Sequence, residues 1–417
     1  MKLTDLDVHQ NGELARTTAT VHFEESDRPS QEIFIETEAT FKNSLAASPH
    51  AFVVGCLIPA LYFGENRLTL SQAICPRLKE GLETVMAIMH HWTAGAFRPL
   101  TIEAPLLTTA LYAERPRHTA IFLSGGMDSL AALKCIMDTY ARPHPGYPRD
   151  ALLVHGFDIG GVIARGAKYH VFERAKAAMA PVAEDAGLTL IPLYTNIRHL
   201  CDERDLWLNQ FFGAVLAAAA HALAPRINLA WLASSYDIPH LHPCGSHPLL
   251  DPEYGSFDLA IRHRDAGLSR MDKLKIVAGW DTAFQNFRIC LANVPDRLNC
   301  GRCEKCVRTM LELEALGLLD KTRAFEADAV DPDWLDAFRI TIRVREPFYM
   351  ELIEPLRKRG RRDLAEKIEV SRQTINAIEA GKYIPSTILA LKLADVFKVE
   401  VLEIFELENS DWKDKTE

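Results

Sequence analysis

Short apolar runs alternate with longer amphipathic or apolar stretches in the middle of the chain. The runs are TAIFL, ALLVHGF, LTLIPLY and INLAWLA. Such alternation predicts parallel strands joined by helical crossovers. The stretch NQFFGAVLAAAAHAL is apolar on nearly all sides, so it predicts a buried crossover helix. We therefore expect residues 118–320 to form an α/β domain built on a parallel sheet.

The two ends of the chain carry different patterns. Residues 1–115 contain the alternating stretches ARTTATVHFE and QEIFIETEA, which predict antiparallel strands, and the helix-like run CPRLKEGLETVMAIMHHW. We assign no chemistry to this N-terminal α+β region. Residues 350–407 carry apolar positions at the spacing of a small helical bundle, so we expect a small all-α module there.

Length and charge narrow the class of protein. The 417 residues suffice for two or three domains, and the formal net charge of -9 argues against a chain that binds a polyanion along its whole length. The apolar runs 51–63 and 211–220 are shorter than the roughly 20 residues that a membrane helix needs. The start, MKLTDLDVHQNG, lacks the features of a signal peptide. We expect a cytoplasmic protein with no membrane partner.

The sequence SGGMDS, Ser124–Ser129, lies between an apolar run and a helix-like stretch. One interpretation is an ordinary strand-to-helix turn. The other is an anion site, because glycines let the backbone approach a phosphate, serines add hydroxyl donors, and a helix N-terminus is positively polarised. Asp128 could then help to hold a Mg²⁺ ion that bridges the phosphates. No Gly-Lys-Ser/Thr follows, so this is not a Walker A loop.

These residues resemble the PP-loop of the N-type ATP pyrophosphatases, the adenine nucleotide alpha hydrolase-like fold. The resemblance implies that ATP is cleaved between its α and β phosphates, that a substrate oxygen is adenylated, and that the loop grips pyrophosphate. Catalytic roles are implied for Ser124, Asp128 and Ser129. The implied nucleotide site comprises the loop and the end of the next strand: Ser124, Gly125, Gly126, Met127, Asp128, Ser129, His155, Gly156 and Phe157.

Four of the nine cysteines cluster late in the chain, at Cys290, Cys300, Cys303 and Cys306. In a reducing compartment such a cluster indicates a metal more often than disulfides. Four thiolates suit a closed tetrahedral zinc site, and the short spacings let one loop wrap the ion. An iron–sulfur cluster and metal-free redox thiols are the alternatives. A closed site leaves no open position, so we assign the zinc to folding.

A PP-loop followed by this cysteine pattern resembles QueC, the cyano-deazaguanine synthase family of queuosine biosynthesis, over residues 118–320. Arg308 matches the arginine that follows the QueC cysteines. The substrate-side stretches depart from QueC, with DIGGVIARGAKYHVFERAK and YTNIRHL in their places. The chain looks more similar to the QueC-like proteins of the Qat and type IV CBASS anti-phage systems, in which the implied chemistry joins a deazaguanine to a protein amine.

The resemblance thus implies an ATP-dependent ligase that adenylates a deazaguanine carboxylic acid and passes it to an amine, with ATP, Mg²⁺ and Zn²⁺ as cofactors. The amine acceptor could be a protein encoded in the same operon. An RNA thiolation or amidation enzyme of the PP-loop class is one alternative. An ATP-sensing regulator that binds DNA is the other.

Polar residues after the run INLAWLA are candidates for the substrate side. A buried acid could pair with the amidine-like edge of a guanine-type base, and a basic residue could steady a phosphate or carboxylate. An ordinary polar loop that caps the sheet is the competing interpretation. The candidates after this run are Ser235, Ser246, His247 and Asp251, and the basic candidate is Arg198, which precedes the run.

The C-terminal stretch DLAEKIEVSRQTINAIEAGKYIPS resembles the Cro/CI (XRE) helix-turn-helix family, with Ser371–Glu379 as its recognition helix. The resemblance implies that Arg372, Gln373, Thr374 and Asn376 face DNA. Residues 356–398 contain ten Lys or Arg against five Asp or Glu, which fits phosphate contacts. The segment between the first two helices is shorter than usual in the family. A dimerisation or partner-docking module is therefore the alternative to DNA binding.

Overall fold

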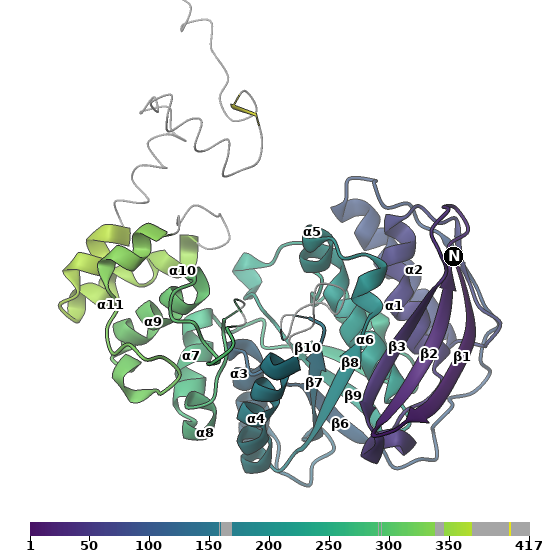
Figure 1. Ribbon diagram of the computed structural model, residues 1–417, viewed down its shortest axis with the longest axis horizontal. Coiled ribbons are helices and arrows are strands. Elements are labelled where there is room, and N and C mark those ends of the chain that lie inside the picture. The colour runs from purple at the N-terminus through teal and green to yellow at the C-terminus, as the bar shows by residue number, and fades with distance from the viewer. Residues whose placement is uncertain are drawn as a thin grey trace, which may run out of the picture. The chain divides into compact units, whose positions relative to one another are not determined.

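The computed structural model describes residues 1–157, 159, 169–290, 292, 294–337, 346–368 and 400–401. The chain divides into two compact units, Met1–Val330 and Asp331–Glu417. The first unit contains a β-sheet flanked by helices, and the second contains a small helical region (Figure 1). This confirms the coarse fold class expected from the sequence.

Ten strands form one sheet in the order β10-β9-β6-β7-β8-β3-β2-β1-β4-β5. Six of the nine pairings are parallel and three are antiparallel. The strands are β1 (Lys2–Asn11), β2 (Leu14–His22), β3 (Gln31–Glu38), β4 (Arg67–Thr69), β5 (Thr101–Glu103), β6 (His118–Phe122), β7 (Pro148–His155), β8 (Thr189–Thr195), β9 (Ile227–Ala233) and β10 (Ala260–Arg264).

The predicted parallel strands are confirmed as β6, β7, β8 and β9, with β10 added at the edge. If these five strands are numbered 1 to 5 along the chain from β6 to β10, their order across the sheet from β8 to β10 is 3-2-1-4-5. This is a doubly wound arrangement, in which the connections from β6 run in opposite directions along the sheet. The point where the direction reverses lies between β6 and β9.

The N-terminal strands extend this sheet. Strands β1, β2 and β3 pair antiparallel, as the alternating pattern predicts, and β3 then pairs antiparallel with β8. Side chains strengthen the junction: the Thr37 hydroxyl donates to the Pro192 carbonyl at 2.7 Å, and the Phe34 N–H donates to Asn196 Oδ1 at 2.8 Å. Residues 1–115 and 118–320 therefore share one sheet and one compact unit.

Helices cover both faces of the sheet (Figure 1). Leu152 and Val154 on β7 belong to the apolar core that includes α1, α2 and α6, whereas Leu153 between them packs with Phe172 of α4. This is the alternation expected of a strand buried on both faces. The helices of this unit are α1 (Pro49–Tyr62), α2 (Pro76–Trp92), α3 (Met127–Thr139), α4 (Tyr169–Ala186), α5 (Arg204–Leu206), α6 (Phe212–Ala222), α7 (Arg270–Ala278), α8 (Asp281–Phe284) and α9 (Glu304–Leu316).

Helices α2 and α6 pack closely against the loop that follows β9. The Gly213 N–H at the start of α6 donates to the Gly245 carbonyl at 3.0 Å, and a Cβ on Gly213 would lie 2.1 Å from that oxygen. On α2, a Cβ on Gly81 would lie 2.0 Å from the Glu253 carbonyl oxygen. Both glycines are needed because the loop backbone touches the helix backbones.

The described part of the second unit is helical. It contains α10 (Glu346–Met350), α11 (Ile353–Lys358) and a helical turn over residues 362–368, separated from α11 by Gly360 in the left-handed region at φ 80°. Helix α11 has only six residues, in line with the shortened segment seen in the sequence. The predicted recognition helix 371–379 lies outside the described residues. Among the described helices, none is long and apolar enough to cross a membrane.

The close contact at Gly213 predicts a large loss of stability for Gly213→Ala. The added methyl group would force α6 away from the 245–254 loop, so we expect the free energy of unfolding to fall by about 1–3 kcal/mol or more. Gly267→Ala is the control, because a Cβ there meets nothing within 4 Å. Chemical denaturation should separate the two variants, and equal midpoints would contradict the close contact.

Candidate functional site

The Ser124–Ser129 loop lies at the carboxyl end of β6, where the sheet order reverses. Gly125 adopts φ 75°, and a Cβ on it would lie 3.1 Å from Met179 Sδ of α4. Gly126 is the N-cap of α3. The first N–H groups of a helix have no carbonyl partner within it, so the start of α3 carries free donors and a positive dipole end. In open α/β sheets this is the place where ligands bind.

Hydroxyl groups hold this loop in shape. The Gly126 N–H donates to Ser124 Oγ at 3.2 Å, and the Ser129 hydroxyl donates to the Gly126 carbonyl at 3.0 Å. The two serine oxygens lie 3.2 Å apart. Met127 and Ser129 are buried, whereas the Asp128 side chain is one-third exposed. The structure therefore brings together all six loop residues that the sequence singled out.

Lys273 reaches the loop from α7. Its Nζ lies 3.0 Å from Asp128 Oδ1 and donates to the Ser234 carbonyl at the end of β9. The lysine side chain is 2% exposed. A buried ammonium is stable only when it is paired, so Asp128 and Ser234 fix its position across the reversal point. Sequence reasoning missed Lys273, because a lysine in an amphipathic helix 145 residues away carries no local signal.

The end of β7 is less accessible than the sequence suggested. The His155 ring is fully buried and stacks on Tyr169, with ring centroids 5.0 Å apart. Neither ring nitrogen has a hydrogen-bond partner among the described residues, and burial lowers the pKa of His155 to about 4. Gly156 adopts φ 92°, and Phe157 packs edge-on against Trp207 at 4.7 Å. The adenine contact implied for these residues stays a prediction, and Asp158 lies outside the described residues.

Arg198, a predicted substrate residue, is engaged in the fold. Its Nε donates to Asp202 at 2.9 Å, and its Nη1 donates to the Phe157 carbonyl at 3.2 Å. Its guanidinium lies over the Trp207 ring, 4.4 Å from the centroid. These contacts support the turn after β7, and they leave the proposed substrate contact as a prediction.

Three of the other predicted substrate residues form one buried network. The fully buried Asp251 carboxylate accepts from the Ser246 hydroxyl at 2.6 Å, from His263 Nδ1 at 2.6 Å and from the His247 N–H at 3.3 Å. The carboxylate would have to give up a partner before it could pair with a base. Ser235 is exposed and lies outside this network.

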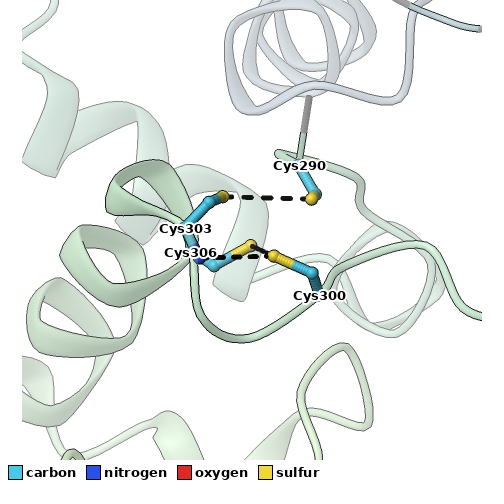
Figure 2. A group of neighbouring side chains, drawn as sticks. All are labelled: Cys290, Cys300, Cys303 and Cys306. Atoms are coloured by element: carbon cyan, nitrogen blue, oxygen red, sulfur yellow. Dashed lines mark hydrogen bonds between the residues drawn. The ribbon is translucent and has the colours of Figure 1, made fainter. Parts of the chain in front are cut away.

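The four late cysteines come together as predicted, and Figure 2 shows their side chains converging. All four sulfur atoms lie within 4.8 Å of one another; Cys290 and Cys303 are 3.9 Å apart, as are Cys300 and Cys306. Two sulfurs of a tetrahedral zinc site with Zn–S bonds of about 2.3 Å are about 3.8 Å apart. A disulfide would need about 2.05 Å. The group therefore fits a zinc ion.

The local backbone suits thiolates. Gly301 adopts φ 71°, and the N–H groups of Arg302 and Cys303 point at Cys300 Sγ at 3.4 and 3.3 Å. The Ala292 N–H likewise donates to Cys290 Sγ at 3.3 Å. Cys303 is the N-cap of α9 and Cys306 lies in its first turn, so the helix carries two ligands.

Residues outside the cluster hold it in place. Asn299 is buried, and its Oδ1 accepts from the N–H groups of Ile289 and Cys290 at 2.8 and 3.2 Å. Its Nδ2 donates to the carbonyl of Phe287 at 3.1 Å. Arg308, which the sequence singled out, is buried on α9 with its guanidinium 3.1 Å from Glu304 Oε1.

Comparison with known proteins shows which proteins the C-terminal segment is similar to. The family model described as helix-turn-helix matches residues 356–404. An uncharacterized HTH-type transcriptional regulator of Methanocaldococcus jannaschii is 55% identical over 49 residues, which are 12% of this chain and 74% of that protein. The uncharacterized HTH-type transcriptional regulator YgzD of Bacillus subtilis is 44% identical over 48 residues, 12% of this chain and 73% of that protein. No solved structure matches the chain.

The cysteine group predicts one zinc ion per chain. Cys303→Ser should reduce the bound zinc and destabilise the protein, because metal binding contributes folding free energy. Cys135→Ser, outside the cluster, is the control and should retain full zinc. Elemental analysis and thermal unfolding measure both effects. Iron in place of zinc, or a well-folded wild-type protein without metal, would contradict the assignment.

Proposed function

The chain belongs to the helix-turn-helix family through residues 356–404, and from this premise we propose a protein of two parts, a DNA-binding C-terminal segment joined to an ATP-cleaving ligase in residues 1–330. One observation carries the ligase proposal: the SGGMDS loop lies at the reversal point of a doubly wound sheet. The buried Lys273 connects this loop, through Asp128, to Ser234 at the end of β9.

The loop offers what a leaving pyrophosphate needs. Backbone N–H groups at the start of α3 and the Ser124 hydroxyl can donate to phosphate oxygens, while the Ser129 hydroxyl donates to the Gly126 carbonyl and holds the loop in shape. Lys273 adds a positive charge held in place by Asp128 and Ser234. An ammonium fixed in a dry site stabilises developing negative charge more strongly than one in water. Asp128 is the residue that would hold Mg²⁺, since its side chain remains partly exposed.

In the proposed reaction a carboxylate oxygen of the substrate attacks the α-phosphorus of ATP. The bond from that phosphorus to the bridging α–β oxygen breaks, giving an acyl adenylate and pyrophosphate. A neutral amine then attacks the acyl carbon, AMP leaves with the carboxylate oxygen, and an amide forms after loss of the amine proton. Adenylation is needed because a free carboxylate is a poor electrophile. A zinc ion held by the four cysteines would have no open position for substrate, so the proposal gives it a role in folding and none in these steps.

The resemblance to QueC-like proteins favours a deazaguanine carboxylic acid as the substrate. It also favours a protein of the same operon as the acceptor, whose amine receives the deazaguanine, in anti-phage defence. The altered stretches where QueC has its substrate-side motifs support an acceptor different from the ammonia that a nitrile synthase uses. Purified protein, ATP, carboxy-deazaguanine and each operon neighbour should together add one deazaguanine mass to a single neighbour.

A second candidate function is an ATP-sensing transcriptional regulator. The relatives that match residues 356–404 are HTH-type regulators, which favours a role for this segment in controlling transcription. The two candidates differ in turnover. A sensor binds ATP and changes its affinity for DNA with little product formed, whereas a ligase releases AMP and pyrophosphate in step with amide formation.

The ligase proposal predicts that the products of ATP are AMP and pyrophosphate. Asp128→Ala removes the proposed Mg²⁺ ligand and the partner of Lys273, and Lys273→Met removes the positive charge at the phosphate site. Each should lower turnover by a factor on the order of 100 or more. Lys275→Met on the same helix is the matched control, since Lys275 is exposed and pairs only with Asp272 in the described structure. Chromatography of the nucleotide products measures the outcome. ADP and phosphate as the only products would contradict the proposal.

The helix-turn-helix segment predicts DNA binding that is separable from ATP cleavage. A chain that ends at Val330 should retain ATP cleavage and lose retention of operon DNA in a gel-shift assay. In the full chain Arg372→Ala should weaken DNA binding, and so should added salt, because cationic contacts to phosphates release counterions. Absence of any DNA retention at low salt would favour the docking alternative.

A further inference from the structure

We propose that the four-cysteine centre and the Ser124–Ser129 loop are energetically linked, so that metal occupancy sets the affinity of the loop for nucleotide. This inference rests on the proposed function in one respect, that the loop binds the phosphates of ATP. Two separate chains of contacts join the two sites within the first compact unit.

The first chain of contacts runs through the segment that leads into Cys290. The Arg288 N–H donates to the Gly125 carbonyl at 2.8 Å, only two residues before that cysteine. Asn299, next to Cys300, binds both the Phe287 carbonyl and the N–H of Cys290. A metal ion that joins Cys290 to Cys300 therefore holds the segment whose N–H fixes the glycine of the phosphate loop.

The second chain of contacts runs through two helices. Helix α9 begins at two cysteines of the cluster, and two turns later its fully buried Thr309 and Glu312 bind Arg270, the first residue of α7. Arg270 Nε lies 2.6 Å from Glu312 Oε1, and its Nη2 donates to Thr309 Oγ1 at 2.7 Å. One turn further along α7, Lys273 contacts Asp128. Movement at the start of α9 thus reaches the carboxylate of the loop.

Loss of the metal frees Cys290 from the start of α9. Both anchors of the phosphate loop then lose a fixed support, so the loop samples more conformations. A nucleotide that binds such a loop must supply the free energy of ordering it, and its affinity falls. Linkage is reciprocal: a bound nucleotide must strengthen metal binding by the same factor.

The test measures this reciprocity on the full-length protein with α,β-methylene-ATP and Mg²⁺ as the probe. Zinc affinity is measured by chelator competition with and without the probe, and probe affinity by calorimetry with zinc-loaded and zinc-stripped protein. We expect both affinities to rise in the presence of the other ligand, by the same factor of roughly 5 to 150. The readout is binding, so it does not depend on turnover.

Asn299→Ala breaks the first chain of contacts and leaves all four cysteines in place. With zinc content unchanged, its affinity for the probe should fall severalfold, and Asn299→Asp should recover part of it because the acceptor for the Ile289 and Cys290 N–H groups remains. Asn286→Ala is the matched control, because among the described residues the Asn286 side chain donates to the Thr282 carbonyl and not to the cysteine segment. This variant should bind the probe with the affinity of the wild type.

Each outcome decides the proposal. Probe affinity that is the same with and without zinc overturns the linkage and leaves the ligase proposal standing. Failure of the probe to bind the zinc-loaded protein overturns both. Should the zinc-stripped protein unfold, the zinc-loaded Asn299→Ala variant decides the question, and an affinity equal to that of the wild type overturns the linkage.

Discussion

The pairing of Lys273 with Asp128 is the interaction on which the candidate site depends. A buried ammonium group is costly unless opposite charge and hydrogen-bond acceptors surround it. Here the acceptors come from the loop after β6 and from the end of β9, the two strands that flank the reversal point of the sheet. The lysine therefore requires these two loops to approach each other. Any anion that binds at this place meets a charge whose position is already fixed.

The N-terminal region carries no catalytic residue that we can identify, yet the sheet needs it. An exposed edge strand offers unpaired N–H and carbonyl groups to other chains. Strand β3 pairs with β8 and so covers this edge of the parallel strands. Helix α1 packs with α6 in the core of the same unit. Helix α2 also presses on the loop that contains Asp251. The region thus acts on the site through the backbone that it holds in place.

Local signals in the sequence predicted much of this architecture. The apolar runs predicted the parallel strands, SGGMDS predicted a turn with exposed donors, and the spacing of Cys300, Cys303 and Cys306 predicted a metal loop. Each signal depends on residues close together in the chain. The family match at residues 356–404 is of the same local kind.

Contacts between distant residues could not be predicted in this way. Lys273 meets Asp128 across 145 residues, and Arg270 meets Glu312 across 42. The pairing of β3 with β8 also depends on which edge of the sheet is free, and alternation of apolar and polar residues does not specify that. Asp251 looked available for a ligand because its partner His263 lies 12 residues away on β10, and no local pattern brings the two together.

The glycines at positions 81 and 213 have a consequence for the evolution of the protein. At each of them a helix backbone lies against the backbone of the 245–254 loop, with no space for even one methyl group. A lineage can replace most surface residues singly, but a side chain at either position requires the loop to be rebuilt at the same time. We therefore expect related sequences that keep this loop to keep both glycines, however far the rest of the sequence has diverged.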